Sequence, residues 1–392
     1  MSESKSPKKA QVIKHVTLLY ILLAAVFLAN SGCSSDKDTL PDPSIEKTYD
    51  GDSTGLKHTV ILPTLDTPTP KGKNVIWCSS FQIAWNELKD NVIGEPVKLI
   101  GAEEIANLLN LAKQSRADIS DKSYYATAGF VKDGIVKKIR TEMAKRFPSE
   151  PQPDFKDVSP EDAIIAYSYL AANVKFKIPF FENTKKFIFK DSQGNKTQVT
   201  SFGIRPEDDY AYQKLRKQVE IIYSLYDPDN HNLLEFAVDL CKDTKPNQIV
   251  LARIEQKETL GQTLSHLDDK IAGFTKVKFF HQIGINDILL VPNIFWRITH
   301  HFTELEEKYL GNTGYENLYI RLALQMIQFR LDRSGAELKT EAKLHAAPKP
   351  SHFVCDQPFL IYMKKRGARH PFFVMWVDNA ELLSKQSLSD TN

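Results

Sequence analysis

"SHFVCDQPFLIYMKKRGARHPFFVMWVDN", residues 351–379, contains two strongly strand-like runs near the C-terminus. The first run, PFLIYM, leads into a basic loop, and the second run, FFVMWV, ends just before Asn379. Aromatic and β-branched residues in such density are typical of strands. The stretch therefore predicts two strands joined by a basic turn.

The stretch immediately upstream is "SGAELKTEAKLHAAPKPSHF", residues 334–353, which follows a further strand-like run at 318–331. Small or apolar residues occupy every second place, with charges between them: Ala336, Leu338, Thr340, Ala342 and Leu344. This alternation suits a strand with one buried face. The same letters also include good helix formers, and they place Leu338, Ala342, His345 and Ala346 on one helical face.

Composition places the 392-residue chain among ordinary globular proteins, with 42% apolar residues, 26% charged residues and a formal net charge of +2. The length permits one large mixed domain or two domains. The Lys and Arg residues are scattered along the sequence, which gives no support for a nucleic-acid partner. Glycine-rich phosphate-binding loops are absent from the sequence, so nucleotide binding has no support either.

The first 33 residues predict an export signal. Four lysines precede the 14-residue apolar run "VTLLYILLAAVFLA" (16–29), which is short for a membrane span. Gly32-Cys33 resembles a bacterial lipoprotein cleavage site, at which Cys33 would be lipidated, although Asn30 stands where such sites prefer an aliphatic residue. Ala29-x-Ser31 also fits ordinary signal-peptidase cleavage, and an uncleaved anchor stays open. Residues 34–73, rich in Asp, Pro, Ser and Thr, predict a tether, with one short strand at 58–63.

Hydrophobic periodicity predicts an α+β protein with helices early and antiparallel strands late. Helices are expected at 79–92 (after a Ser cap), 101–115, 134–147, 259–271 and 303–310. Strands are expected at 124–131, 218–227, 233–241, 248–255, 274–283 and 287–298, with a hairpin over 185–204 that turns at Gln193-Gly194-Asn195.

The run at 159–181 gives conflicting signals. Ser159-Pro160-Glu161-Asp162 has the form of a helix N-terminus with a capping box, and local rules marginally favour a helix. The long apolar run that follows is equally typical of a central strand.

Polar and cysteine residues suggest no catalytic or metal site. The segment "DPDNHN" (227–232) begins like a calcium loop, but Asn232 occupies the obligatory Gly place, so a polar turn is expected. His300 and His301 are adjacent and would face different ways. Cys78, Cys241 and Cys355 are far apart in sequence and odd in number, which predicts buried thiols rather than a disulfide framework.

The C-terminal stretch resembles the ending of serpins, F-x-x-D-x-P-F-L, through Phe353, Asp356, Pro358, Phe359 and Leu360, with Asn379 closing it. Other stretches resemble the family in the expected order. These are 74–88, 171–189 with Asn173, Phe176 and Lys177, 287–311, and the hinge 329–337 with Asp332, Gly335 and Glu337. The resemblance covers roughly residues 74–380. It implies large, mostly antiparallel sheets with helices packed around them, and it makes 162–176 a buried central strand.

In a serpin, the stretch after the hinge is the reactive loop, which is displayed to a protease and inserts into the large sheet when cut. The resemblance thus implies reactive-loop residues at Gly335, Glu337, Leu338, Thr340, Leu344, Lys349 and Pro350. Three features depart from an inhibitor: the loop is short, the expected scissile bond Lys349-Pro350 precedes a proline, and the hinge is rich in helix formers. The family's first helix and the helix that crosses the front of its sheet have no counterpart before Asn74 or between Phe147 and Ser159.

The sequence therefore predicts a signal at 1–33, a tether at 34–73 and a serpin-like domain at 74–385. We expect a non-enzymatic, exported protein that is lipid-anchored to the cell envelope or, otherwise, secreted, with a non-inhibitory binding or scaffold role and no cofactor. The alternative is a serine-type protease inhibitor that acts by insertion of its reactive loop. The expected partners are an extracellular or periplasmic protease or another envelope protein, and the membrane through the lipid, but not nucleic acid.

Overall fold

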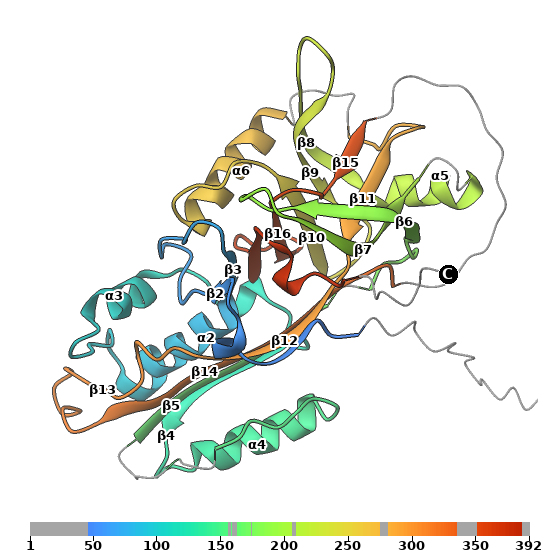
Figure 1. Cartoon of the computed structure of the whole chain (residues 1–392). Helices are drawn as coiled ribbons and strands as arrows, with labels where there is room; N and C mark the ends of the chain where they lie inside the picture. Colours follow the sequence, from blue (N-terminus) through green and yellow to red (C-terminus); the bar gives the residue numbers. More distant parts are fainter. Residues whose placement is uncertain are drawn as a thin grey trace, which may run out of the picture. The chain divides into compact units, whose positions relative to one another are not determined.

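The computed structural model of the chain describes residues 46–155, 158, 163–173, 175–205, 209–274, 281–334 and 351–385. All of these described residues belong to one compact unit. Three sheets and their covering helices make up this unit (Figure 1), which confirms the predicted α+β class. The predicted signal at 1–33 lies outside the described residues.

One sheet, which we call the large sheet, has six strands, in the order β1-β12-β14-β5-β4, with β13 paired to β14. Its strands are β1 (Tyr49–Asp52), β4 (Tyr124–Phe130), β5 (Ala163–Asn173), β12 (Ile294–His301), β13 (Lys308–Tyr309) and β14 (Tyr319–Leu331).

The central strand β5 lies between β4, which is antiparallel to it, and β14, which is parallel to it. The β5–β14 register runs from Ala163 opposite Tyr319 to Asn173 opposite Arg330. All residues of β5 up to Leu170 are buried. The prediction of a central strand is therefore confirmed over 163–173. Burial of a continuous apolar run on both faces of a sheet outweighs the local helix-start signal.

Residues 46–73, which the sequence assigned to the tether, contribute to two sheets. Strand β1 pairs in parallel with β12, and β2 (Thr59–Ile61) pairs in parallel with β3 (Asn74–Cys78). The short strand predicted within 58–63 is thus confirmed. The folded unit begins earlier than the predicted residue 74, because these segments cover sheet edges that would otherwise carry unpaired backbone groups.

The C-terminal stretch 351–379 contains the antiparallel pair β16 (Phe359–Lys365) and β17 (Phe373–Val377). The turn between them contains Gly367, whose φ of 82° suits glycine. Both strands belong to a seven-stranded sheet, in the order β2-β3-β17-β16-β10-β9-β8. Its remaining strands are β8 (Glu220–Tyr226), β9 (Leu233–Asp239) and β10 (Asn247–Arg253).

A four-stranded sheet in the order β15-β11-β7-β6 completes the set. Its strands are β6 (Phe181–Lys190), β7 (Lys196–Ile204), β11 (Ile288–Pro292) and β15 (His352–Val354). The predicted hairpin over 185–204 is confirmed as β6–β7, with Gly194 at a φ of 89° in its turn. A Cβ on Gly203 would lie 1.8 Å from the carbonyl oxygen of Leu289, so only glycine allows this close approach of β7 to β11.

The prediction of one strand over 287–298 is wrong. The segment divides into β11 and β12, which belong to different sheets. Between them, the N–H of Asn293 donates to the carbonyl of Thr200 at 3.0 Å. The apolar pattern continues through the junction because both strands are buried, so the pattern alone does not show the change of sheet.

Five α-helices are described: α2 (Ser79–Glu87), α3 (Glu103–Leu111), α4 (Ile135–Arg146), α5 (Asp209–Gln218) and α6 (Leu260–Phe274). All but α5 were predicted. The expected Ser cap of α2 is wrong, since Cys78 is the N-cap and makes no side-chain cap bond. Most of the strand predicted at 274–283 lies outside the described residues.

The helix predicted at 303–310 is also wrong. This segment is a turn followed by β13, with Glu307 at a φ of 58°. Its backbone bonds to β14 and to the residues preceding it: the N–H of Glu307 donates to Ile320 O at 2.7 Å, and that of Leu310 to Leu318 O at 2.9 Å. Pairing with the sheet replaces the bonds that a helix would have made.

Helices α2 and α4 both pack against β4 and β5, and they cover opposite faces of the large sheet (Figure 1). Helix α2 lies in the main core, with Phe81 and Trp85 buried. Helix α4 packs the predicted face of Ile135, Ile139 and Met143 into a separate cluster on the outer face.

Candidate functional site

All residues predicted for the reactive loop lie outside the described residues: Gly335, Glu337, Leu338, Thr340, Leu344, Lys349 and Pro350. Cys33 lies outside them as well. The structure does describe both ends of this segment, at Ser334 and Ser351, and the β5–β14 seam beside the first end. These surroundings form the candidate site.

The first end of the segment is fixed by Asp332 at the close of β14. Its side chain is buried, pairs with Arg330 and accepts the backbone N–H of Ser334 at 2.8 Å. The carbonyls of Arg333 and Ser334 accept the N–H groups of Phe180 and Phe176 at 3.1 and 3.2 Å. The chain is therefore held firmly up to the point where residues 335–350 begin.

The second end is fixed by Asp287, next to β11. One carboxylate oxygen accepts the N–H of Ser351 at 2.8 Å, and the N–H of Ile288 donates to the carbonyl of Ser351 at 2.9 Å. Strand β15 then continues in parallel with β11. Both ends of the segment thus emerge from fixed backbone.

A pocket of about 430 Å³ adjoins the second end, between β15 and the β8–β9 hairpin. Arg253 lies in its wall and donates to the carbonyls of Leu233 and Val354 at 2.6 and 3.3 Å. The Asp356 carboxylate is 3.8 Å from Arg253, and burial raises its pKa above the ordinary value. The arginine already bonds two carbonyls of its own chain, so its first role is to join β9 to β15.

A polar cluster lies beneath the β5–β14 seam, on its inner face. Gln325 of β14 donates to the Ser80 hydroxyl of α2 at 2.9 Å, and that hydroxyl lies 3.4 Å from the Ser168 hydroxyl of β5. Among the described residues, the Ser79 hydroxyl and the side-chain amide oxygen of Gln325 are buried without a hydrogen-bond partner. Unpaired polar atoms under a seam weaken the packing that holds two strands together.

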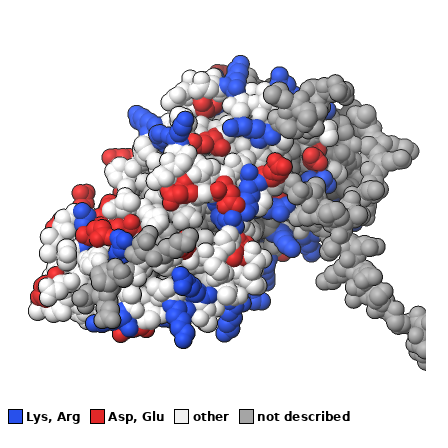
Figure 2. All heavy atoms as spheres, turned by 60° about the horizontal axis from the view of Figure 1, so that its bottom comes forward, with Lys and Arg blue, Asp and Glu red and all other residues white. Residues whose placement is uncertain are grey.

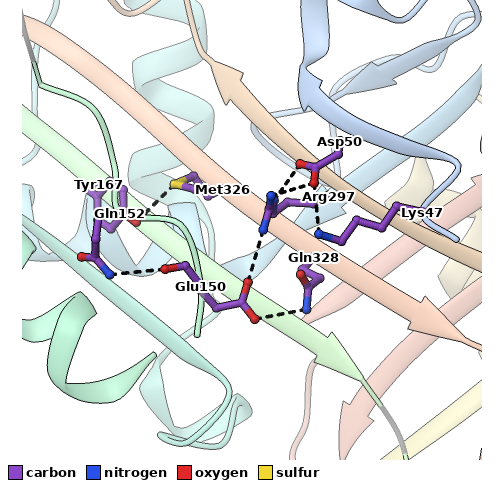
Figure 3. Close-up of polar contacts among 8 residues, drawn as sticks. All are labelled: Lys47, Asp50, Glu150, Gln152, Tyr167, Arg297, Met326 and Gln328. Carbon is purple, nitrogen blue, oxygen red and sulfur yellow. Dashed lines mark hydrogen bonds and ion pairs between the residues drawn. The ribbon is translucent and has the colours of Figure 1, made fainter. Parts of the chain in front are cut away.

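The outer face of the same seam is crossed by residues 147–155, which we call the strap. Figure 3 shows the Glu150 carboxylate between Arg297 of β12, at 3.7 Å, and Gln328 of β14, at 3.4 Å. Arg297 also pairs with Asp50 of β1 at 2.7 Å, and Asp50 pairs with Lys47 at 3.0 Å. One chain of polar contacts thus connects the strap with three neighbouring strands.

Aromatic contacts fix both ends of the strap to β5. The ring of Phe147 lies 4.6 Å from that of Tyr169, and the ring of Phe155 lies 6.1 Å from that of Tyr167. Burial raises the pKa of both tyrosines well above the ordinary value, and the nearby Glu150 carboxylate adds to the rise at Tyr169. The strap therefore closes the seam from outside with apolar as well as polar contacts.

The predicted thiols are confirmed, because Cys78, Cys241 and Cys355 are free and buried. Burial raises the pKa of all three thiols, in the case of Cys241 to about 12. The polar turn at 227–232 is confirmed, with the Asp227 carboxylate accepting backbone N–H groups of its own turn.

His300 and His301 have different partners, Ser53 and Glu306. Within the described residues, no group of three or more His, Cys, Asp or Glu side chains could hold a metal ion. None of the described helices has the length and apolar character needed to cross a membrane.

Comparison with solved structures finds serpins. The structure of native protease nexin-1 with heparin covers 78% of this chain and 92% of its own, with 12% identity and a TM-score of 0.49. Mouse protein-Z dependent protease inhibitor gives 13% identity and a TM-score of 0.48, covering 78% and 91%. Serpin48 from the insect Tenebrio molitor gives 13% and 0.46, covering 78% and 92%.

These likenesses concern the fold and assign no role to any residue of this chain. No protein-family model matches the sequence, and no curated protein matches it.

Proposed function

We propose that this chain is a non-catalytic, non-inhibitory binding protein of the cell envelope, which presents residues 335–350 to a partner protein. Its two fixed ends, at Ser334 and Ser351, support presentation of the segment between them. Export and lipidation at Cys33 belong to the same proposal. Mass spectrometry of the mature N-terminus tests the anchoring, and normal processing of Cys33→Ala would contradict it.

The observation that carries the non-inhibitory reading is the strap. An inhibitor of the serpin type must open the seam between β5 and β14 to admit its cut loop. Here the two strands pair directly from Ala163–Tyr319 to Asn173–Arg330, and Glu150 joins the strap to β14 and β12 across the outer face. Opening the seam would break that pairing and expel the strap, so the arrangement favours a stable scaffold.

Incubation with a panel of serine proteases tests this function directly. The chain from residue 34, which lacks the signal, would be mixed with each protease and separated in SDS. We expect cleavage within 336–350 without a covalent adduct. In parallel, capture of envelope proteins by this chain should be lost when residues 338–347 are scrambled.

A protease inhibitor is the second candidate, and the polar cluster under the seam favours it. The unpaired Gln325 oxygen and the weakly bonded Ser80–Ser168 pair would ease separation of β5 from β14. In that case Lys349 or a neighbouring residue would serve as bait. An SDS-stable adduct with any protease of the panel would decide for this candidate.

A further inference from the structure

Helix α4 concentrates positive charge on a chain that is otherwise acidic. Five of its residues are basic, namely Lys137, Lys138, Arg140, Lys145 and Arg146, and Glu142 is its one acid, so its formal charge is +4. Residues 1–33 contain four Lys and one Glu, and their removal takes the chain from +2 to −1. The rest of the predicted mature chain therefore sums to −5. Because Lys and Arg residues are scattered along the sequence, the sequence alone does not show that α4 is basic and the rest of the mature chain acidic.

The arginines of α4 have structural contacts, whereas the lysines do not. Arg140 lies over the ring of Phe155 at 5.7 Å, and Arg146 lies over the ring of Tyr125 at 5.5 Å and donates to a carbonyl at Asp121. Lys137, Lys138 and Lys145, which we call the lysine face, are exposed. Within the described part of the chain these three have no carboxylate partner. Figure 2 turns this side forward, and Lys and Arg side chains line the lower part of the view.

The lysine face does not serve the stability of its own helix. Lys137 and Lys138 lie in the first turn, where the helix dipole disfavours cations. No acidic residue stands in that turn, and the N-cap, Gly134, makes no side-chain cap bond. A solvated helix surface needs some charge, but it does not need three unpaired cations of one sign with two of them at the wrong end.

We propose that the lysine face is a docking surface for an anionic lipid membrane. Lysines near such a surface gain about fivefold in binding for each residue, through attraction to many mobile headgroups rather than to one shaped site. The face suits this contact because α4 is packed rigidly through Ile135, Ile139 and Met143, and its outer side offers charge without large exposed apolar groups.

The predicted anchor keeps the body within reach of such a surface. Residues 34–45 precede the described unit, and about a dozen residues span at most about 40 Å. A tether of this length limits the distance from the membrane but not the orientation of the body. Contact through α4 would set that orientation. The membrane contact goes beyond the proposed function. It rests on that proposal for the lipid anchor, but it is independent of binding at 335–350.

Lys137 and Lys138 lie near the end of the large sheet that is remote from Ser334, and α4 then runs toward the middle of the sheet, where Phe147 contacts Tyr169. The N–H of Val131, just before α4, donates to Ala163 O at 2.9 Å, so the helix begins at the end of the sheet where β5 and β14 start. Ser334 follows the opposite end of β14. The thirteen residues of β14 separate these two ends by about 40 Å.

Vesicle sedimentation of the unlipidated chain from residue 34 tests the proposal, since the folded unit begins after the removed part. Vesicles of phosphatidylcholine alone would be compared with vesicles containing about one third phosphatidylglycerol, at about 0.1 M and about 0.5 M salt. We expect binding to the anionic vesicles only, weakened strongly by salt. The triple variant Lys137→Gln, Lys138→Gln, Lys145→Gln should bind about a hundredfold more weakly.

The matched control removes three exposed lysines elsewhere, Lys185→Gln, Lys186→Gln and Lys190→Gln on β6, and should bind as the parent chain does. Equal losses in the two variants, or equal binding to neutral vesicles, would overturn the lysine face as a specific docking surface. Absence of vesicle binding together with binding to dextran sulfate would replace the lipid by a soluble polyanion. Absence of both would overturn the proposal altogether. None of these outcomes bears on binding at 335–350.

Discussion

Glu150 is the residue through which the strap acts on the large sheet, and its charge can be tested alone. Glu150→Gln keeps the shape of the side chain but removes the charge that faces Arg297. Both side chains are mostly buried, so we expect a loss of about 1–2 kcal/mol in the free energy of unfolding. Urea denaturation measures this loss. The exposed Glu258→Gln should stay within about 0.5 kcal/mol of the parent chain, and equal effects of the two changes would refute the role given to Glu150.

His300 makes the junction between β12 and the residues after β1 sensitive to acid. Its Nδ1 lies 2.8 Å from the Ser53 hydroxyl, and its Nε2 is buried without a partner among the described residues. Burial lowers its pKa to about 4, against a small opposing effect of Asp52. The unfolded chain keeps the ordinary value of about 6.5, so stability is complete above pH 6.5 and is lost as the pH falls toward 4.

The variant His300→Gln should lack this part of the pH dependence. Between pH 7.5 and 4.5, the parent chain should lose about 2–3 kcal/mol more of its unfolding free energy than the variant does. His301 acts in the opposite sense, because its bond to Glu306 raises its pKa, but it is present in both chains and cancels. Denaturant unfolding at the two pH values gives the comparison. If the unfolding free energies of the parent chain and the variant changed equally between the two pH values, His300 would either stay neutral or gain a partner on protonation.

Helices and strands with strong periodic patterns could be predicted from the sequence, whereas the strands and sheets that they pair with could not. The apolar face of α4 and the hairpin β6–β7 follow from local spacing, which fixes which residues are buried. The split between β11 and β12 could not be predicted, because a buried strand has the same composition in either sheet. The turn at 303–310 is stabilised by backbone hydrogen bonds to β14 and the residues before it. The local sequence of 303–310 predicts a helix and does not show these bonds.

The strap was missed for a related reason. Its Pro-rich sequence predicts only an irregular break, and nothing local shows that Glu150 reaches Arg297, a residue 147 positions away in the chain. Phe155 among prolines and acids was the available signal, since an aromatic residue in a polar segment is often an anchor. Of the candidate site, the sequence predicts residues 335–350 as a displayed segment, but it does not show the contacts that surround the two ends of that segment.

The displayed segment itself is an element whose state a single change can report. Thr340 would face inward if residues 338–347 were buried as a strand, and it would face solvent in a helix that docks through Leu338. With β5 and β14 paired directly, we expect Thr340→Glu to change the unfolding free energy by less than about 0.5 kcal/mol. Leu338→Glu should cost about 1–2 kcal/mol if the helix docks. A cost of several kcal/mol at Thr340 would mean that its carboxylate is buried, which contradicts the expectation.

At the scale of the whole molecule, the closed seam bears on how much free energy the fold holds in reserve. A fold that gains a strand when its loop is cut becomes far more stable after cleavage. In this chain such a gain would first require loss of the β5–β14 ladder and of the strap contacts made by Phe147, Glu150 and Phe155. The stability gained from an added strand would be offset by the loss of these contacts, so the net gain in unfolding free energy after cleavage should be small.

Limited proteolysis within 336–350, followed by thermal unfolding, tests this balance. We expect the melting temperature of the cut chain to stay within a few degrees of the intact one. The strap variant Phe155→Ala provides the decisive comparison, because it weakens the outer cover of the seam while leaving the ladder and the displayed segment unchanged. If the strap is what keeps the seam closed, cleavage should raise the melting temperature of this variant more than that of the parent chain. A rise of tens of degrees in the parent chain itself would show that the seam opens despite the strap, and the protease inhibitor would then be the better account of the molecule.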